Sequence, residues 1–172
     1  EDVLEGRLPD WLHAIGDAGG EAPLTHWGKY RARVVGAQIA AGAGESPAPP
    51  EAPVPQVVFT DPQVSAVGLT EAAARDAGHD VVTATVPVAD IGGTALLRDD
   101  PSGRALLVVD RSTGLVLGTT FVGAEVGELL HAATVAITGE VPVHVLRHAV
   151  PSFPTASEVW LRLLEQLPRE LR

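Results

Sequence analysis

Six histidines and no cysteines decide which metal or nucleophilic chemistry this sequence supports. His144 and His148 are four residues apart in His144-Val-Leu-Arg-His148, a spacing that places two ligands on one helix face. The glutamate that follows the first histidine of a zinc-protease motif is absent, so this pair predicts a surface turn of helix. His13, His79 and His131 show no ligand spacing with carboxylates. Without cysteine, disulphides, Cys-ligated zinc and a thiol nucleophile are excluded, and we expect no metal site.

Two carboxylates have neighbours that suggest a role. Thr155-Ala-Ser-Glu158 has the capping-box pattern, in which Thr155 and Glu158 satisfy each other's main-chain donors at a helix start. Asp17 follows Gly16 in a glycine-rich turn, where aspartate tolerates unusual dihedral angles. No G-x-G-x-x-G loop follows a strand, and neither a nucleophile elbow nor a plausible triad is present, which argues against a hydrolase.

The chain is strongly acidic. Its 172 residues include 12 Lys and Arg against 22 Asp and Glu, a formal net charge of −10. Such a surface repels phosphate backbones, and no Lys/Arg cluster reverses this locally, so we expect no nucleic-acid partner. No apolar run approaches the roughly 20 residues of a spanning helix, so we expect a cytoplasmic protein without membrane attachment. The chain starts at Glu1 and has no methionine, so we expect a fragment.

Five prolines between Pro47 and Pro55 predict a stiff boundary, because proline disrupts helices and sheet ladders. We therefore expect one piece at residues 1–44, a linker at residues 45–55 and the main domain at residues 56–172. In the first piece, residues 11–15 predict a strand that a glycine turn stops, and residues 25–41 predict a helix. Two elements are too few to bury each other's apolar faces, so this piece needs a larger body.

The elements of the main domain follow from its hydrophobic periodicity and turn residues. Four strands are expected, at residues 56–60, 82–88, 104–110 and 115–122, the last two as a hairpin. Three helices are expected, at residues 71–77 after the cap Thr70, at residues 124–138 before Gly139, and at the C-terminus around Trp160 to Leu167. Pro87 indicates an edge strand, and Gly118 and Gly123 indicate close packing. Together these elements predict an α+β fold, an antiparallel sheet covered by helices on one face.

Four stretches, in order along the chain, carry a family resemblance. Residues 54–71 (VPQVVFTDPQVSAVGLTE) closely resemble the opening of the dimerisation domain in the family of dihydrolipoamide dehydrogenase, glutathione reductase and mercuric reductase, the pyridine nucleotide-disulphide oxidoreductases. Residues 11–17 resemble the flavin-domain strand that ends in Gly-Asp, and residues 118–127 resemble the family's glycine-bearing strand with the helix after it. Residues 151–158 resemble the terminal motif that crosses to the partner subunit.

The resemblance implies that residues 1–44 are the remnant of an FAD-binding domain. It implies that Asp17, beside Gly16, hydrogen-bonds a ribityl hydroxyl of FAD, for which a carboxylate with two acceptor oxygens is suited. It also implies that the helix opened by Thr25 and His26 directs its N-terminus towards the pyrimidine end of the flavin, where the helix dipole favours negative charge. Gly16, Asp17, Thr25 and His26 are therefore the candidate cofactor-binding residues.

The terminal motif departs from the family at one position. In the family, the glutamate orients a histidine five residues earlier, and the pair manages protons in dithiol chemistry beside the partner subunit's flavin. Here that position is Phe153, which carries no proton, so Glu158, the one candidate catalytic residue, is expected only to cap its helix. This loss disfavours a small disulphide as substrate and favours another acceptor, such as a metal ion, a quinone or another nucleotide.

The resemblance thus implies a fragment of an FAD-dependent NAD(P)H oxidoreductase, chiefly its homodimerisation domain. We expect no activity from the isolated chain, and weak or no FAD binding, because the nucleotide-binding units and the redox-active cysteine pair would precede Glu1. The alternative is a stand-alone α+β dimerisation or binding module without redox activity, which residues 11–41 argue against. Four candidate dimer contacts, at least half of which should instead belong to the core, are Phe153, Trp160, Leu161 and Leu164.

Overall fold

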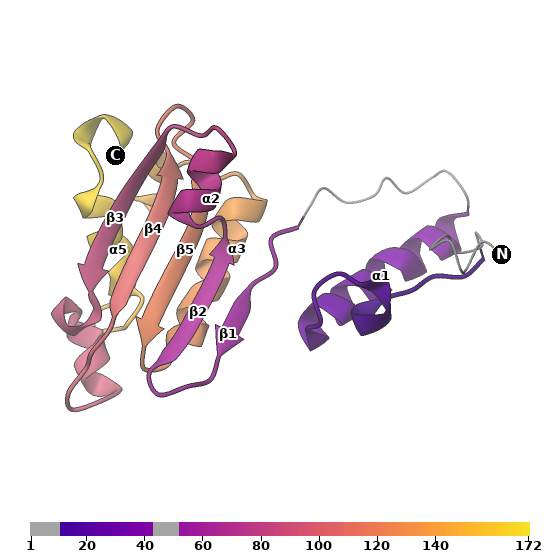
Figure 1. Ribbon diagram of the computed structural model, residues 1–172. Coiled ribbons are helices and arrows are strands. Elements are labelled where there is room, and N and C mark those ends of the chain that lie inside the picture. Colours follow the sequence, from indigo (N-terminus) through magenta and orange to yellow (C-terminus); the bar gives the residue numbers. More distant parts are fainter. Residues whose placement is uncertain (1–10, 43–51) are drawn as a thin grey trace. The chain divides into compact units, whose positions relative to one another are not determined.

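The computed structural model describes residues 11–42 and 52–172, in two compact units that divide between Val54 and Pro55. In the first unit, a 3-10 turn η1 (Gly16–Gly19) precedes one helix, α1 (Thr25–Ala41), which starts where the sequence predicts (Figure 1). The strand predicted at residues 11–15 is wrong, because the main chain there has no neighbouring strand in the described part of this unit. Most of the expected linker lies in residues 43–51, outside the described ranges.

Helix α1 extends over 17 residues and buries none of them. Its apolar residues Trp27, Tyr30 and Val34 are only half-buried, and Ile39 is 62% exposed. Helices in proteins owe most of their stability to packing of an apolar face. This unit therefore lacks, within the described residues, the body against which such a face would pack.

The second unit is built on a five-stranded antiparallel sheet of order β1-β2-β5-β4-β3 (Figure 1). Its strands are β1 (Gln56–Val58), β2 (Gln63–Gly68), β3 (Val81–Pro87), β4 (Arg104–Asp110) and β5 (Val116–Gly123). The β4–β5 hairpin and the edge position of Pro87 in β3 confirm the predictions, and Val82, Ala84 and Val86 face the main core as their alternation indicates.

Strand β2 was not predicted. It pairs with β5 along its whole length, from Gln63 opposite Gly123 to Gly68 opposite Gly118. Its Ser65 is buried, and the hydroxyl donates to the main-chain oxygen of Val126 at 3.0 Å. A small polar side chain on the core side weakens the apolar alternation by which a strand is recognised.

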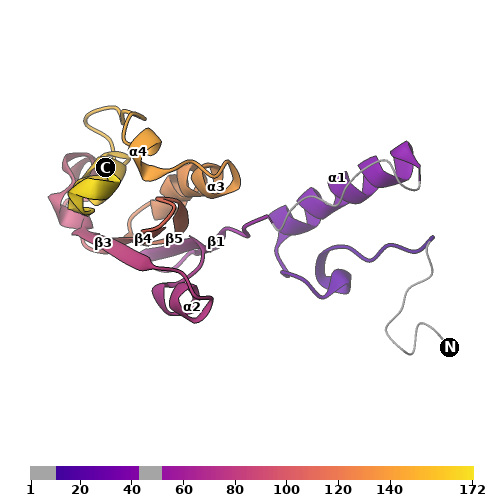
Figure 2. The ribbon, with the colours of Figure 1, turned by 90° about the horizontal axis from the view of Figure 1, so that it is seen from above.

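Helices cover the sheet mainly on one face. Three helices lie there: α3 (Leu130–Thr138), α4 (Val143–Leu146) and α5 (Glu158–Gln166). The short α2 (Glu71–Asp76) lies on the opposite face, where Ala74 packs with Val81 and Val108 (Figure 2). The hydroxyl of Thr70 caps α2 by accepting from the N–H of Ala73 at 3.2 Å, as predicted. The α+β prediction is confirmed, with α2 as an addition to it.

The helix expected at residues 124–138 is interrupted near its start. Glu125 has a φ of 53°, a 3-10 turn η4 (Val126–Leu129) follows, and regular α-helix begins only at Leu130. Two further 3-10 turns, η2 (Val88–Asp90) and η3 (Gly92–Leu96), lie between β3 and β4, and η5 (Arg169–Leu171) follows α5. The left-handed residue breaks the helical path, which hydrophobic periodicity alone does not reveal.

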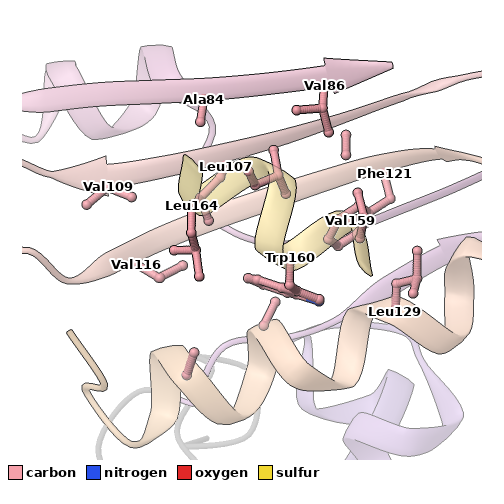
Figure 3. Close-up of a cluster of buried hydrophobic side chains, with 14 of the residues drawn as sticks. Ala84, Val86, Leu107, Val109, Val116, Phe121, Leu129, Val159, Trp160 and Leu164 are labelled. Carbon is pink, nitrogen blue, oxygen red and sulfur yellow. The ribbon is translucent and has the colours of Figure 1, made fainter. Parts of the chain in front are cut away.

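The main core lies between the sheet and α3 and α5. Phe121 and Leu107 of the sheet and Leu163 of α5 are fully buried, and the rings of Phe121 and Trp160 meet edge to face with centroids 5.8 Å apart (Figure 3). Gly118 lies so close to the neighbouring chain that an added Cβ would stand 2.1 Å from the carbonyl oxygen of Leu69. Close packing at Gly118 is therefore confirmed.

Candidate functional site

The candidate flavin-binding residues lie around the start of α1. Gly16 has a φ of 63°, which glycine adopts without strain, and among the described residues no atom beyond its two chain neighbours lies within 4 Å of the position its Cβ would take. A Cβ at Gly28, in the first turn of α1, would lie 3.4 Å from the Cα of Gly16, so the helix start lies against the Gly-Asp turn. Asp17 is exposed, in the first turn of η1.

The start of α1 carries no side-chain cap, since its N-cap residue is Leu24. Thr25 and His26 are exposed there. Glu21 holds the preceding loop to the helix by accepting from Trp27 Nε1 at 2.6 Å and pairing with Arg31 at 3.1 Å. The structure thus brings the four predicted residues to one exposed helix start. An open glycine, a carboxylate and an uncapped N-terminus fit part of the contact surface that FAD requires.

Glu158, at the start of α5, does not cap this helix. No side-chain cap hydrogen bond is present, and the hydroxyl of Thr155 instead donates to the main-chain oxygen of Ser152 at 2.6 Å. The capping-box prediction is wrong because Ser157, the N-cap, already has helical dihedral angles, and the Glu158 N–H donates to the Thr155 main-chain oxygen at 3.2 Å. A main-chain acceptor replaces the side-chain acceptor that the pattern predicts.

The carboxylate of Glu158 is buried with only one of its oxygens partnered. Oε1 accepts from Arg162 at 2.8 Å, whereas Oε2 has no hydrogen-bond partner among residues 11–42 and 52–172. A Cβ on Gly92 would lie 3.4 Å from the ring of Phe153 and 3.6 Å from this Oε2. The structure therefore brings Phe153 and Glu158 together beside Gly92. The ring of Phe153 offers the carboxylate no proton and no hydrogen bond.

The four candidate dimer contacts divide evenly between core and surface. Trp160 and Leu164 are 7% and 5% exposed and belong to the core, whereas Leu161 and Phe153 are 36% and 78% exposed. The expectation that at least half belong to the core is confirmed. Near Phe153 along the chain, Val150 is 86% exposed. Large exposed apolar side chains mark interaction surfaces when they cluster.

One pair of titratable residues was missed by sequence reasoning. Asp110, at the end of β4, is buried and accepts from Ser112 Oγ at 2.6 Å, from the Ser112 N–H at 2.8 Å and from His79 Nδ1 at 2.8 Å. The Ser112 hydroxyl first, and then His79, lower the pKa of Asp110 to about 2. His79 and Asp110 are 31 residues apart, so only the pairing of β3 with β4 brings them together. The pair links the loop after α2 to the hairpin, a structural role.

Within the described part of the chain, no group of three or more His, Asp or Glu side chains is arranged to hold a metal ion. The helices described there are also too short or too polar to cross a membrane. His144 and His148 are exposed, as predicted for a surface turn of helix.

Comparisons with known proteins agree with the family resemblance of the sequence. The family model for the pyridine nucleotide-disulphide oxidoreductase dimerisation domain matches residues 54–164. Dihydrolipoyl dehydrogenase of Bacillus subtilis (strain 168) is 30% identical over 154 residues, 90% of this chain and 32% of that protein. Dihydrolipoyl dehydrogenase of Mycobacterium leprae (strain TN) is 37% identical over 147 residues, 86% of this chain and 31% of that protein.

Among solved structures, the Cu(II) complex of the HOCl-induced flavoprotein disulfide reductase RclA from Escherichia coli is similar with a TM-score of 0.81 at 28% identity. The match covers 92% of this chain and 36% of that one. The chain thus spans about a third of the length of the relatives it matches.

Proposed function

Because the chain belongs to the pyridine nucleotide-disulphide oxidoreductase family, whose dimerisation domain it carries, we propose that it is the C-terminal part of a homodimeric FAD-dependent enzyme oxidising NAD(P)H. The observation that carries this proposal is the family match over residues 54–164, in a chain that spans about a third of its relatives. Residues 56–172 would associate two subunits about a two-fold axis, so that one surface meets its own copy. The chain alone would be inactive.

The first unit would hold part of the flavin. Asp17 would accept a hydrogen bond from a ribityl hydroxyl, and open Gly16 lets the cofactor approach the main chain. The uncapped start of α1, at Thr25 and His26, would place a partial positive charge towards the flavin. Bound FAD supplies the two-electron redox chemistry. That α1 buries no residue supports a remnant over the self-sufficient start of a stand-alone module.

The electron acceptor would differ from a small disulphide. Phe153 lies beside Glu158 in place of a residue that carries protons, and the Oε2 of Glu158 is buried without a partner in the described ranges. Dithiol chemistry needs a group that titrates near neutral pH at this point. Reduction of a metal ion, a quinone or another nucleotide does not require a proton from the side chain at position 153. We therefore infer an acceptor of one of these kinds.

Titration of the 172-residue chain with FAD tests the remnant assignment. We expect the flavin fluorescence to stay that of free FAD at micromolar concentrations, because only a few of the cofactor contacts are present. Asp17→Ala provides a comparison, since it should leave that result unchanged. Stoichiometric FAD binding that Asp17→Ala weakens would contradict the assignment of residues 1–44 as a remnant and would favour a self-contained flavin site.

The acceptor is tested on the intact enzyme, by measuring NADH and NADPH oxidation with lipoamide, glutathione disulphide, benzoquinone and Cu(II). General acid–base catalysis contributes about 100-fold or more, so we expect both disulphides to be at least that much slower than the better of the other two acceptors. Comparable rates with lipoamide would refute the inference drawn from Phe153, while leaving the family assignment intact.

A further inference from the structure

A cavity of about 510 Å³ lies beside α5, and neither Phe153 nor Glu158 is among its lining residues. Its lining comes from the end of α4, from α5 and from the C-terminal turn η5. It is lined by Arg147, Leu161, Leu164, Glu165, Arg169 and Arg172. Three guanidinium groups thus share one hollow in a chain whose net charge is −10.

The charges of this cavity are largely unneutralised. Arg147 and Arg169 have no carboxylate partner among the described residues, and Arg172 donates to the main-chain oxygen of Glu165. Among the lining residues, the one carboxylate side chain is that of Glu165, which already pairs with Arg162 at 3.1 Å. Sequence analysis finds no Lys/Arg cluster, because Arg147 and Arg169 are 22 positions apart and only the fold places both in the lining of one cavity.

The main chain that carries these arginines is fixed by buried neighbours. Val143 anchors α4 and is fully buried, while Leu167 and Leu171, 2% and 9% exposed, anchor the chain on either side of Arg169. Leu164 belongs to the core and forms an apolar wall of the cavity next to half-exposed Leu161. Groups held at fixed positions lose less conformational freedom when a ligand binds.

From this arrangement we infer a binding site for a small oxyanion with at least two negative charges, such as a diphosphate or a dicarboxylate. The planar guanidinium group presents paired N–H donors that match the oxygens of phosphate and carboxylate groups. Two unpaired arginines that line one hollow suit a ligand with two anionic groups, and the leucine wall suits an apolar part between them. This site is independent of the proposed electron transfer and of the flavin.

Calorimetric titration of the 172-residue chain with pyrophosphate and with succinate, in buffer of low ionic strength, tests the site. We expect saturable binding of at least one of the two at a single site. Arg147→Gln and Arg169→Gln should each weaken it by about tenfold, since one charge-assisted contact is worth roughly that factor. Pyrophosphate and succinate distinguish a phosphate ligand from a dicarboxylate.

Arg104→Gln is the matched control, because Arg104 is exposed on β4, outside the cavity, and the change removes the same charge. It should leave the affinity within about twofold, and far-UV circular dichroism should be unchanged for all three variants. The site is refuted if neither anion saturates, or if Arg104→Gln weakens binding as much as the cavity variants do. Unaltered binding by Arg147→Gln and Arg169→Gln would refute it equally.

Discussion

Replacing Asp110 with asparagine should destabilise the second unit by about 2 kcal/mol at pH 6 and flatten its stability profile in acid. The carboxylate is buried and accepts three hydrogen bonds, from Ser112 Oγ, the Ser112 N–H and His79 Nδ1. These donors lower the pKa of Asp110 from its ordinary 3.8 to about 2. One pKa unit corresponds to about 1.4 kcal/mol, so the shift sets the size of the expected loss.

The direction of the pH effect depends on whether the folded or the unfolded state binds the Asp110 proton more tightly. Because the folded pKa lies below the unfolded one, the stabilisation is complete above about pH 4 and disappears as the pH falls through about 2. Roughly half of it should be lost by pH 3. An asparagine at this position does not titrate, so its contribution stays constant across this range.

Urea unfolding followed by far-UV circular dichroism at pH 6, 4.5 and 3 measures both effects. Asp99→Asn is the matched control, because Asp99 is exposed and the substitution removes the same charge. The free energy of unfolding should fall more steeply with acid for the unaltered chain and for Asp99→Asn than for Asp110→Asn. Parallel profiles for all three proteins would refute the role of the Asp110 hydrogen bonds.

Three further substitutions test the packing of the second unit. Gly118→Ala should cost about 2 kcal/mol or more, because its Cβ would stand 2.1 Å from the Leu69 carbonyl oxygen; an unchanged melting temperature would contradict this contact. Thr70→Ala should cost about 1 kcal/mol in urea unfolding, because the Ala73 N–H loses its acceptor, whereas Thr70→Ser should restore most of it. Leu163→Ala should cost about 2–5 kcal/mol, since Leu163 is fully buried; a loss below 1 kcal/mol would place it outside the core.

Local signals in the sequence were enough to predict most elements of the second unit. The turn at residues 111–114 identified the β4–β5 hairpin, Thr70 identified the start of α2, and Pro87 identified an edge strand. These features depend on residues close together in sequence, where dihedral preferences and apolar periodicity act. Strand β2 was missed because the buried Ser65 satisfies its hydroxyl through Val126, 61 positions away.

The features that bear on function depend on main-chain dihedral angles and tertiary contacts that the residue pattern does not specify. The capping-box prediction at Thr155 and Glu158 was wrong because Ser157 already has helical dihedral angles and the Glu158 N–H donates to the main-chain oxygen of Thr155. The salt bridge between Glu158 and Arg162 was not predicted, although a spacing of four residues is typical of such pairs on one helix face. No local signal indicates that Phe153 and Glu158 meet at Gly92, or that Arg147 shares a cavity with Arg169.

Sedimentation equilibrium of the 172-residue chain at micromolar concentrations tests the central proposal most directly. A dimerisation domain that pairs with its own copy should give twice the 17.8 kDa mass of one chain, with dissociation only on dilution. A single species of 17.8 kDa throughout that range would contradict the association role proposed for residues 56–172.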